Sequence, residues 1–156
     1  MDYKIREIRK HEYRLLDDFL YEAIFIPKGA SAPPKEIIRK PELQIYVSDF
    51  GKQDDNCLVA ECNGKVIGAV WARIMDDYGH IDNDTPSLAI SLYKNFRSMG
   101  IGSALMNKMI ELLKSKGYTR ISLSVQKDNY AYNLYKKVGF EVVKENCGEF
   151  IMIIKL

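Results

Sequence analysis

LAISLYKNFRSMGIGSAL, residues 88–105, holds the strongest structural signal in the chain. Its first six residues form an apolar run that predicts a buried strand, and apolar residues at helical spacing predict a helix over 100–116. Between the two stands Arg97-Ser98-Met99-Gly100-Ile101-Gly102. Glycines let the backbone turn tightly and approach a ligand, and the free N–H groups at a helix start attract an anion. The segment therefore predicts a phosphate-binding loop between a strand and a helix.

The loop differs from two common nucleotide motifs, and the charge around it fits a small polyanion. It lacks the Gly-Lys-Ser/Thr ending of a Walker loop and the G-x-G-x-x-G spacing of dinucleotide folds. Residues 94–156 carry 11 Lys/Arg against 5 Asp/Glu, a net charge of +6. Residues 1–93 carry 12 against 16, a net charge of −4. We expect a polyanionic ligand at the basic part and a cationic one facing the acidic part.

Length and composition narrow the class of protein. The 156 residues are 47% hydrophobic with a net charge of +2, which predicts one globular domain over residues 1–156. No basic run predicts nucleic-acid binding, and no apolar stretch reaches the 18 residues that a membrane span needs. The N-terminus has no apolar segment typical of a signal peptide. Three cysteines without CxxC spacing indicate reduced thiols and a cytoplasmic location.

Periodicity and turn residues predict alternating strands and helices. We expect strands over 3–8, 57–62, 65–74, 88–93, 121–125, 140–144 and 150–156. We expect helices over 13–25, 100–116 and 130–137, with short helical turns at 36–39 and 41–48. Asn63-Gly64 predicts a type I′ turn between the second and third strands. Cys57 and Cys62 then face opposite sides of their strand, so they are not a metal pair. This order predicts a mixed α/β domain with a central sheet.

At this point the sequence resembles the Gcn5-related N-acetyltransferase (GNAT) superfamily. The Arg97–Gly102 loop is similar to that family's pyrophosphate-binding motif, and Asn129–Phe140, NYAYNLYKKVGF, is similar to a second family segment about 30 residues later. The resemblance extends over nearly the whole chain, from Tyr3 to Leu156. It implies a single GNAT domain whose mixed, mostly antiparallel sheet of six to seven strands is flanked by helices. Acetyl-CoA would lie at the splayed strand before the loop.

The resemblance also implies an activity and a set of site residues. The family transfers acetyl groups from acetyl-CoA to primary amines without a metal, and we expect a small amine as the acceptor. Backbone amides would bind the pyrophosphate at Arg97, Ser98, Met99, Gly100, Ile101, Gly102 and Ser103. The strand residues Ile90, Ser91 and Leu92 would pair with the pantetheine arm. The Leu92 N–H would polarise the thioester carbonyl, and Asn129 would hydrogen-bond the arm.

Tyr135 is the candidate acid, implied by the resemblance to lie near the sulfur. A tyrosine hydroxyl has a pKa of about 10, so it stays protonated at neutral pH and can protonate a leaving thiolate. Packing is the alternative role, because Tyr135 lies at helical spacing with Ala131. For Asn129, the alternative is a helix N-cap, and the two roles are compatible.

The general base is the least determined residue. An alkyl amine has a pKa of about 10.4 and must lose a proton before it attacks. Many relatives carry a Glu at the start of the strand before the loop, but this chain has Ser87 there. The candidates are His80, whose ordinary pKa suits the task best, a carboxylate from Asp82, Asp84 or Glu61, and a water molecule.

The loop over 75–86 contains Asp76, Asp77, Asp82 and Asp84. Their spacing does not match a calcium loop, so we expect no metal and a solvated loop beside the acceptor site. Its charge would favour a cationic amine.

Aromatic residues near the N-terminus are candidates for the acceptor pocket. Phe19, Tyr21, Phe25 and the loop 27–34 fall where the family shapes this pocket, although core packing is the common role of such residues. Trp71 and Arg73, which face the same way, could border it too.

The sequence also suggests a candidate assembly and two alternative activities. The strand 150–156 looks apolar enough to offer a spare sheet edge, so a homodimer is the candidate assembly. One alternative activity is acetylation of a protein N-terminus or lysine. Another is a non-catalytic acyl-CoA-binding sensor, which the missing Glu at position 87 motivates.

Overall fold

The computed structural model describes residues 1–156, and its central hairpin forms as the turn signal predicts. Strand β2 (Asn56–Cys62) joins β3 (Lys65–Arg73) through Asn63 and Gly64, whose φ angles are 51° and 76°. Two successive positive φ angles are typical of a type I′ turn, which matches the twist of the strands on either side. The predicted hairpin is therefore confirmed.

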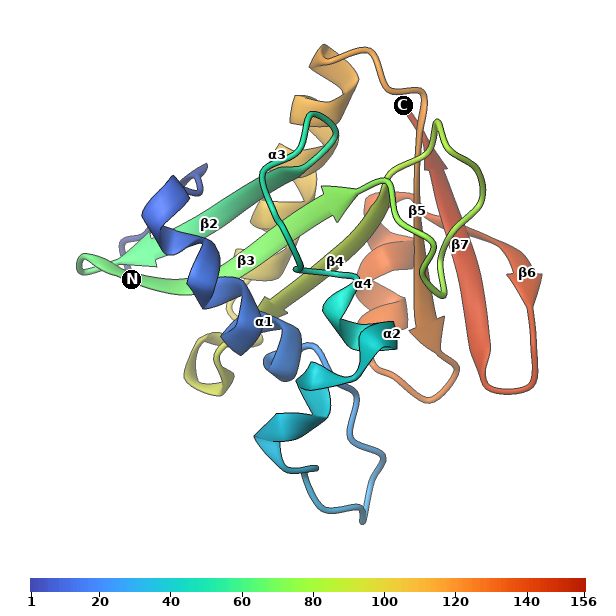
Figure 1. Ribbon diagram of the computed structural model, residues 1–156, viewed down its shortest axis with the longest axis horizontal. Coiled ribbons are helices and arrows are strands. Elements are labelled where there is room, and N and C mark those ends of the chain that lie inside the picture. The colour runs from blue at the N-terminus through green and yellow to red at the C-terminus, as the bar shows by residue number, and fades with distance from the viewer.

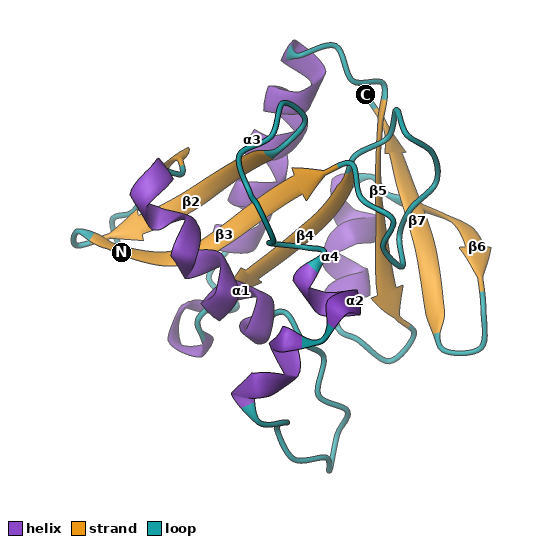
Figure 2. Cartoon of the chain, viewed as in Figure 1, coloured by secondary structure: helices purple, strands orange, loops and turns teal.

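All seven strands belong to one mixed sheet (Figures 1 and 2), in the order β1-β2-β3-β4-β5-β7-β6. The remaining strands are β1 (Lys4–Glu7), β4 (Ser87–Leu92), β5 (Arg120–Gln126), β6 (Glu141–Glu145) and β7 (Glu149–Lys155). Every neighbouring pair is antiparallel except β4 and β5, which are parallel. The predicted mixed, mostly antiparallel sheet of six to seven strands is confirmed.

Helices cover both faces of this sheet. They are α1 (Leu16–Glu22), α2 (Pro41–Gln44), α3 (Ile101–Ser115) and α4 (Ala131–Val138), with 3-10 turns at Lys10–Leu15, Lys35–Arg39 and Lys94–Phe96. One core lies between the sheet and α3 with α4, and a smaller core lies under α1 on the other face (Figure 1). The sheet is thus the middle layer of three. None of the helices combines the length and apolarity that a membrane span needs.

The positions of two cysteines and the length of the first helix test two predictions made from the sequence. Cys62 packs with Leu105 and Met109 of α3, whereas Cys57 packs with Phe19 of α1. The two thiols therefore lie on opposite faces of β2, as their spacing predicts, and all three cysteines are free. The helix expected over 13–25 is shorter, because a 3-10 turn precedes α1 and the helix ends at Glu22.

The prediction of a spare sheet edge at the C-terminal strand is wrong. β7 pairs with β5 on one side and with β6 on the other, so it has no free edge. The exposed edge belongs to β6, which carries Glu141, Lys144 and Glu145. Charged side chains on an edge strand discourage pairing with another chain. The homodimer remains a prediction, without the apolar edge that motivated it.

β4 and β5 touch only where they begin. Their ladder consists of one residue pair, Ser87 with Ser122, and one further hydrogen bond runs from the Ser122 N–H to the Pro86 carbonyl, 3.0 Å long. Beyond this point the two strands diverge (Figure 2). The divergence opens the sheet between its fourth and fifth strands, β4 and β5, and positions the site described next.

Candidate active site

A cavity of about 440 Å³ lies where β4 and β5 diverge. Its wall is formed by Leu20, Ala23, Ile24, Phe25, Ile37, Leu43, Tyr46, Tyr78, Leu88, Ala89, Ile90, Ser124, Val125, Gln126, Asn129, Tyr135 and Glu149. These residues come from the α1–α2 side, from the loop before β4, from the two diverging strands, from the start of β7, and from α4 on the opposite face. The cavity thus passes through the opening in the sheet and connects its two faces.

The backbone of β4 presents unpaired N–H groups to this opening. The Tyr93 N–H donates to the Ile67 carbonyl of β3, 3.0 Å away. Donors alternate in direction along an antiparallel strand, so the N–H groups of Ile90 and Leu92 face away from β3, toward β5. Ile90 also lines the cavity, whereas Leu92 does not. The third predicted strand residue, Ser91, points to the other face, where its hydroxyl donates to the Phe19 carbonyl at 2.7 Å.

The predicted phosphate loop has the geometry of an uncapped helix start. Gly100 adopts a left-handed conformation with φ 83°, α3 begins at Ile101, and no side chain caps the helix. The first N–H groups of a helix have no partner within the helix, so those of Ile101, Gly102 and Ser103 are available to a ligand. A Cβ added at Gly100 would meet nothing within 4 Å, so the loop has open space in front of it. This arrangement fits a pyrophosphate group.

Three other loop residues take distinct positions. Ser98 has a positive φ of 62°, which helps the chain reverse direction before the helix, and Met99 is exposed. The Arg97 guanidinium points back into the chain, donating to the Leu92 carbonyl at 2.9 Å and to Glu22. Arg97 therefore stabilises the strand-to-loop connection with its side chain, which leaves only its backbone for an anion.

Asn129 lies in the cavity wall and also begins α4. Its Oδ1 accepts the Ala131 N–H at 2.9 Å, and its Nδ2 donates to the Gln126 Oε1 at 3.1 Å. The capping role that the sequence offered as an alternative is thus present. One Nδ2 hydrogen makes the contact with Gln126, so the other is free for a ligand in the cavity.

Tyr135 combines burial with an unpaired hydroxyl. Only 9% of the residue is exposed, it lines the cavity, and its hydroxyl makes no hydrogen bond within the chain. Burial raises the pKa of Tyr135 to about 12, because the phenolate would lose its hydration. A protonated donor is therefore held at the cavity at neutral pH.

Two of the four expected base residues, Glu61 and Asp82, form ion pairs, and a third, Asp84, is exposed. Glu61 forms ion pairs with Arg6 and Lys4 on β1, which lower the pKa of its carboxyl. Asp82 pairs with Arg120, and its pKa is lowered chiefly by a hydrogen bond from Thr85. Neither these two residues nor the exposed Asp84 lines the cavity.

His80 is the fourth candidate, and its ring Nδ1 lies 2.9 Å from the Met75 carbonyl. Because a carbonyl only accepts, Nδ1 carries the proton in this contact. The residue does not line the cavity either.

Asp77, which the sequence analysis did not single out as a base, is the carboxylate closest to the expected position. The Ser87 hydroxyl donates to its Oδ1 at 2.8 Å, so Asp77 lies against the residue that stands where relatives carry Glu. Tyr46 lines the cavity, and its pKa is raised chiefly by burial and also by the charge of the nearby Asp77. Burial raises the pKa of Asp77 above its usual range, although the hydrogen bond from Ser87 opposes the shift.

The four aspartates of the 75–86 loop therefore do not act together. Asp77 is partly buried and bonded to Ser87, Asp82 pairs with Arg120, and Asp76 and Asp84 are exposed. The prediction that this loop is solvated is therefore wrong at Asp77. No three His, Cys, Asp or Glu side chains are grouped as metal ligands would be.

Of the aromatic residues expected at the acceptor pocket, only Phe25 lines the cavity. Phe19 is 1% exposed and packs against Tyr93 with a ring-centroid distance of 4.9 Å, so it belongs to the core under α1. Tyr21 instead fixes the loop that follows, because its hydroxyl donates to the Pro33 carbonyl.

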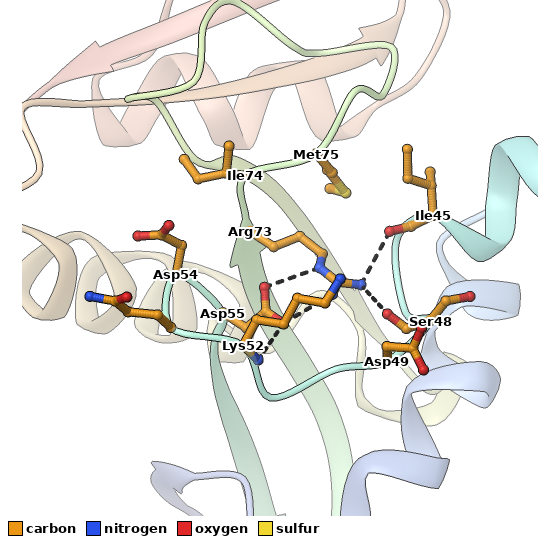
Figure 3. Close-up of a pocket in the computed structure, with 10 residues that line it drawn as sticks. Ile45, Ser48, Asp49, Lys52, Asp54, Asp55, Arg73, Ile74 and Met75 are labelled. Carbon is orange, nitrogen blue, oxygen red and sulfur yellow. Dashed lines mark hydrogen bonds and ion pairs between the residues drawn. The ribbon is translucent and has the colours of Figure 1, made fainter.

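Trp71 and Arg73 do not border this cavity, and that expectation is wrong. Trp71 is fully buried and donates to the Tyr46 carbonyl at 3.0 Å. Arg73 lines a separate polar cavity of about 370 Å³ (Figure 3), where its guanidinium donates to both carboxylate oxygens of Asp55. It also donates to the Ile45 and Ser48 carbonyls. Four of the five guanidinium N–H groups are used, so Arg73 fixes the segment after α2 to the sheet.

Comparison with known proteins agrees with the fold and the loop. The model of the acetyltransferase (GNAT) family matches residues 12–140. The sheet that opens within its parallel pair, with an uncapped glycine turn beside the opening, is consistent with this match. The chain belongs to the GNAT family.

Two curated relatives share a substantial part of the sequence. An uncharacterized N-acetyltransferase of Methanocaldococcus jannaschii is 34% identical over 161 residues, which cover 98% of this chain and 66% of the relative. A protein of Xenopus tropicalis named "Probable N-acetyltransferase camello" is 30% identical over 105 residues, or 67% of this chain and 47% of the relative. The matched regions thus span 47% and 66% of the length of these two relatives.

Solved structures show the same fold at lower identity. The PaiA N-acetyltransferase of Thermoplasma acidophilum, solved in complex with coenzyme A, superposes with a TM-score of 0.74 at 20% identity over the full length of both chains. The ribosomal-protein-S18-alanine N-acetyltransferase of Escherichia coli gives 0.69 at 16% identity, covering 99% of this chain and 94% of the other.

Proposed function

We propose that this protein is an acetyl-CoA-dependent N-acetyltransferase that acts on a small primary amine. The observation that supports this best is the unpaired hydroxyl of Tyr135, an otherwise buried residue, in a cavity that passes through the opening of the sheet. A bound donor and an acceptor arriving from the other face would meet there. The relatives named N-acetyltransferases support the same reaction type.

Acetyl-CoA would be held mostly by backbone. The N–H groups at the start of α3 suit its pyrophosphate, and the free N–H groups of β4 suit the amide groups of its pantetheine arm. The second Nδ2 hydrogen of Asn129 is available to the same arm. The cosubstrate supplies a thioester, whose carbonyl would be polarised by an N–H on β4, that of Leu92 or of Ile90.

The chemistry needs one proton acceptor and one proton donor. The amine nitrogen forms a bond with the thioester carbon, and the carbon–sulfur bond breaks. The amine must lose a proton, and the leaving thiolate must gain one. We assign the amine proton to Asp77, which would be reached through the hydroxyl of the nearby cavity-wall residue Tyr46. Tyr135 gives its proton to the thiolate, and its raised pKa keeps that proton available.

This assignment favours an enzyme over a non-catalytic sensor. The sensor alternative rested on the absence of a carboxylate at position 87. Ser87 instead hydrogen-bonds the carboxylate of Asp77, so the carboxylate that we propose as the base lies near the start of β4, although it comes from another segment. A cytoplasmic location is part of the proposal, since the cysteines form no disulfide.

Release of free thiol from acetyl-CoA tests the function. The purified chain is assayed with a panel of alkyl amines, amino acids, polyamines and short peptides, and coenzyme binding is measured in parallel by calorimetry. We expect release that depends on an amine acceptor. Binding without release from any acceptor would favour the sensor, and absent binding would contradict the whole assignment. Preference for peptides would point to protein acetylation instead.

A further inference from the structure

The strand β5 divides its polar and apolar residues between the two faces of the sheet. Leu123 and Val125 pack into the core under α3, so the alternate residues Ser122, Ser124 and Gln126 face the α1–α2 side. Ser124 and Gln126 line the cavity, and Gln126 pairs with Glu149 of β7. The cavity therefore has a polar strip on the face from which an acceptor would approach.

Glu149 is the charged member of this strip and has no cationic partner. Of the 17 residues in the wall, 13 are hydrophobic, and Glu149 is the one that carries a formal charge at neutral pH. No salt bridge involves its carboxylate. The nearby Lys127 is engaged elsewhere, 3.6 Å from Glu145 and 5.5 Å from the centroid of the Phe150 ring.

A half-buried carboxylate in an apolar wall favours a cationic ligand and disfavours an anionic one. Desolvation of the carboxylate is costly unless an opposite charge compensates it. The same wall contains no Lys or Arg that could pair with a ligand carboxylate. Charge selectivity then has both an attractive and a repulsive part, as specific sites commonly do.

The position of Glu149 separates this charge from the reacting nitrogen. The acetyl carbonyl would lie against β4, and Glu149 is on β7, with β5 between them. Two strand spacings amount to about 10 Å, before the divergence of β4 and β5 is added. Glu149 is therefore placed to bind a second cationic group of the acceptor, with the apolar wall in contact with the chain between the two groups.

We propose that the acceptor is an amine whose far end carries a second positive charge, separated from the reacting nitrogen by an apolar spacer, and that Glu149 selects for that charge. This inference rests on the proposed acetyltransferase function and names its substrate class. Glu149 binds the distal ammonium, and Asp77 with Tyr46 accepts the proton from the reacting nitrogen.

Three acceptors of matched length test the proposal: 1,5-diaminopentane, hexylamine and 6-aminohexanoate. They share an aminopentyl chain and end in an ammonium, a methyl group and a carboxylate. We expect kcat/KM to fall in that order, by about tenfold at each step for the wild-type protein. Equal values for the three acceptors would overturn the inference and leave the acetyltransferase function standing.

Variants of Glu149 give the sharper test. Glu149→Gln is expected to raise KM for the diamine about tenfold while leaving hexylamine unchanged, and Glu149→Lys should make 6-aminohexanoate the preferred acceptor. Glu145→Gln is the matched control, because Glu145 is exposed on the same hairpin and outside the cavity wall. An unchanged order of preference in Glu149→Lys would contradict the proposal.

Acceptor binding is measured by calorimetry on the protein saturated with coenzyme A. This measurement distinguishes failure of the inference about Glu149 from failure of the proposed function. If no acceptor is acetylated but the diamine binds more tightly than hexylamine in a Glu149-dependent way, the inference holds and the proposed function fails. If binding shows no such preference, the inference fails whatever the turnover.

Discussion

A single hydroxyl group makes the site chemically specific at the residue scale. Tyr135 as a residue is only 9% exposed, but its unpaired hydroxyl is the part that remains accessible, because no fully buried side-chain oxygen or nitrogen lacks a hydrogen-bond partner. A hydroxyl at a cavity surface can donate to a ligand without first breaking a hydrogen bond within the chain. Its proton is therefore available to the thiolate of a substrate.

Tyr135→Phe is expected to lower kcat about 100-fold while coenzyme affinity stays within about twofold. The phenyl ring keeps the packing but has no proton to give. Steady-state thiol release and calorimetry measure the two quantities. Tyr132→Phe is the control on the same helix, because its ring packs against Phe150 and outside the cavity wall. An unchanged kcat in Tyr135→Phe would remove this residue from the mechanism.

The pH profile identifies the base. Asp77 accepts a proton only when ionised, so kcat/KM should fall as pH drops through its pKa, which burial places above the usual aspartate range. Ser87→Ala removes a hydrogen bond that favours the carboxylate, so it should move this acidic limb to higher pH. Asp77→Asn should lower kcat about 100-fold and abolish the limb.

Asp76→Asn is the control for the pH profile, because this neighbouring carboxylate is exposed. An acidic limb that persists in Asp77→Asn would show that another group is the base.

At the residue scale, the sequence predicted the features that depend only on the local backbone. The loop residues Gly100 and Gly102 could be read directly, since a glycine turn before a helix requires no distant partner. Asp77 could not be read, because it is one of four aspartates in an aperiodic loop. Only its contact with Ser87, ten residues later at the start of β4, distinguishes it from Asp76.

At the scale of one element, the two ends of α3 have similar backbone geometry, but only one of them can bind a ligand. Gly100 and Gly117 flank the two ends of this helix, both with positive φ, at 83° and 92°, and with nothing within 4 Å of an added Cβ. An alanine at either position adopts an unfavourable conformation at a similar cost, about 1 kcal/mol. Only the Gly100 end presents free N–H groups to a ligand.

The pair Gly100→Ala and Gly117→Ala therefore separates stability from binding. We expect both variants to lose about 1 kcal/mol of unfolding free energy in urea titrations. Coenzyme affinity should fall at least tenfold in Gly100→Ala and stay unchanged in Gly117→Ala. Equal affinities in the two variants would show that the N-terminal loop of α3 does not hold the coenzyme.

Element types were easier to predict than element neighbours. The hairpin of β2 and β3 follows from Asn63-Gly64, and β7 was expected over nearly its observed length. Its place between β5 and β6 was missed, because the order of strands depends on pairings between distant segments. An apolar strand looks the same in sequence at the edge of a sheet and in its interior.

For the whole molecule, a buried ion network fixes the N-terminus to the sheet. Arg6 of β1 donates two hydrogen bonds to the buried Glu12, at 2.9 and 2.8 Å, and a third to Glu61 of β2 at 3.0 Å. The Arg6 guanidinium lowers the pKa of Glu12 from 4.5 to about 2. A carboxyl with a lowered pKa stabilises the folded state above its unfolded pKa and loses that contribution as pH falls.

Glu12→Gln should therefore destabilise the protein by about 2 kcal/mol at pH 7. The difference from the wild type should shrink as pH falls from 4.5 toward 2, because protonation then removes the same charge from the wild type. Urea unfolding at several pH values measures it. A difference that stays constant down to pH 2 would contradict the assigned pKa.

The one-pair joint between β4 and β5 has a consequence for amide hydrogen exchange. Along β4, the amides of Ala89 and Ser91 are directed toward β3, whereas those of Ile90 and Leu92 face the opening. Deuterium uptake should thus alternate residue by residue within one strand, slow at the first two positions and fast at the others. An extended ligand that occupies the opening would act as an eighth strand and remove the alternation.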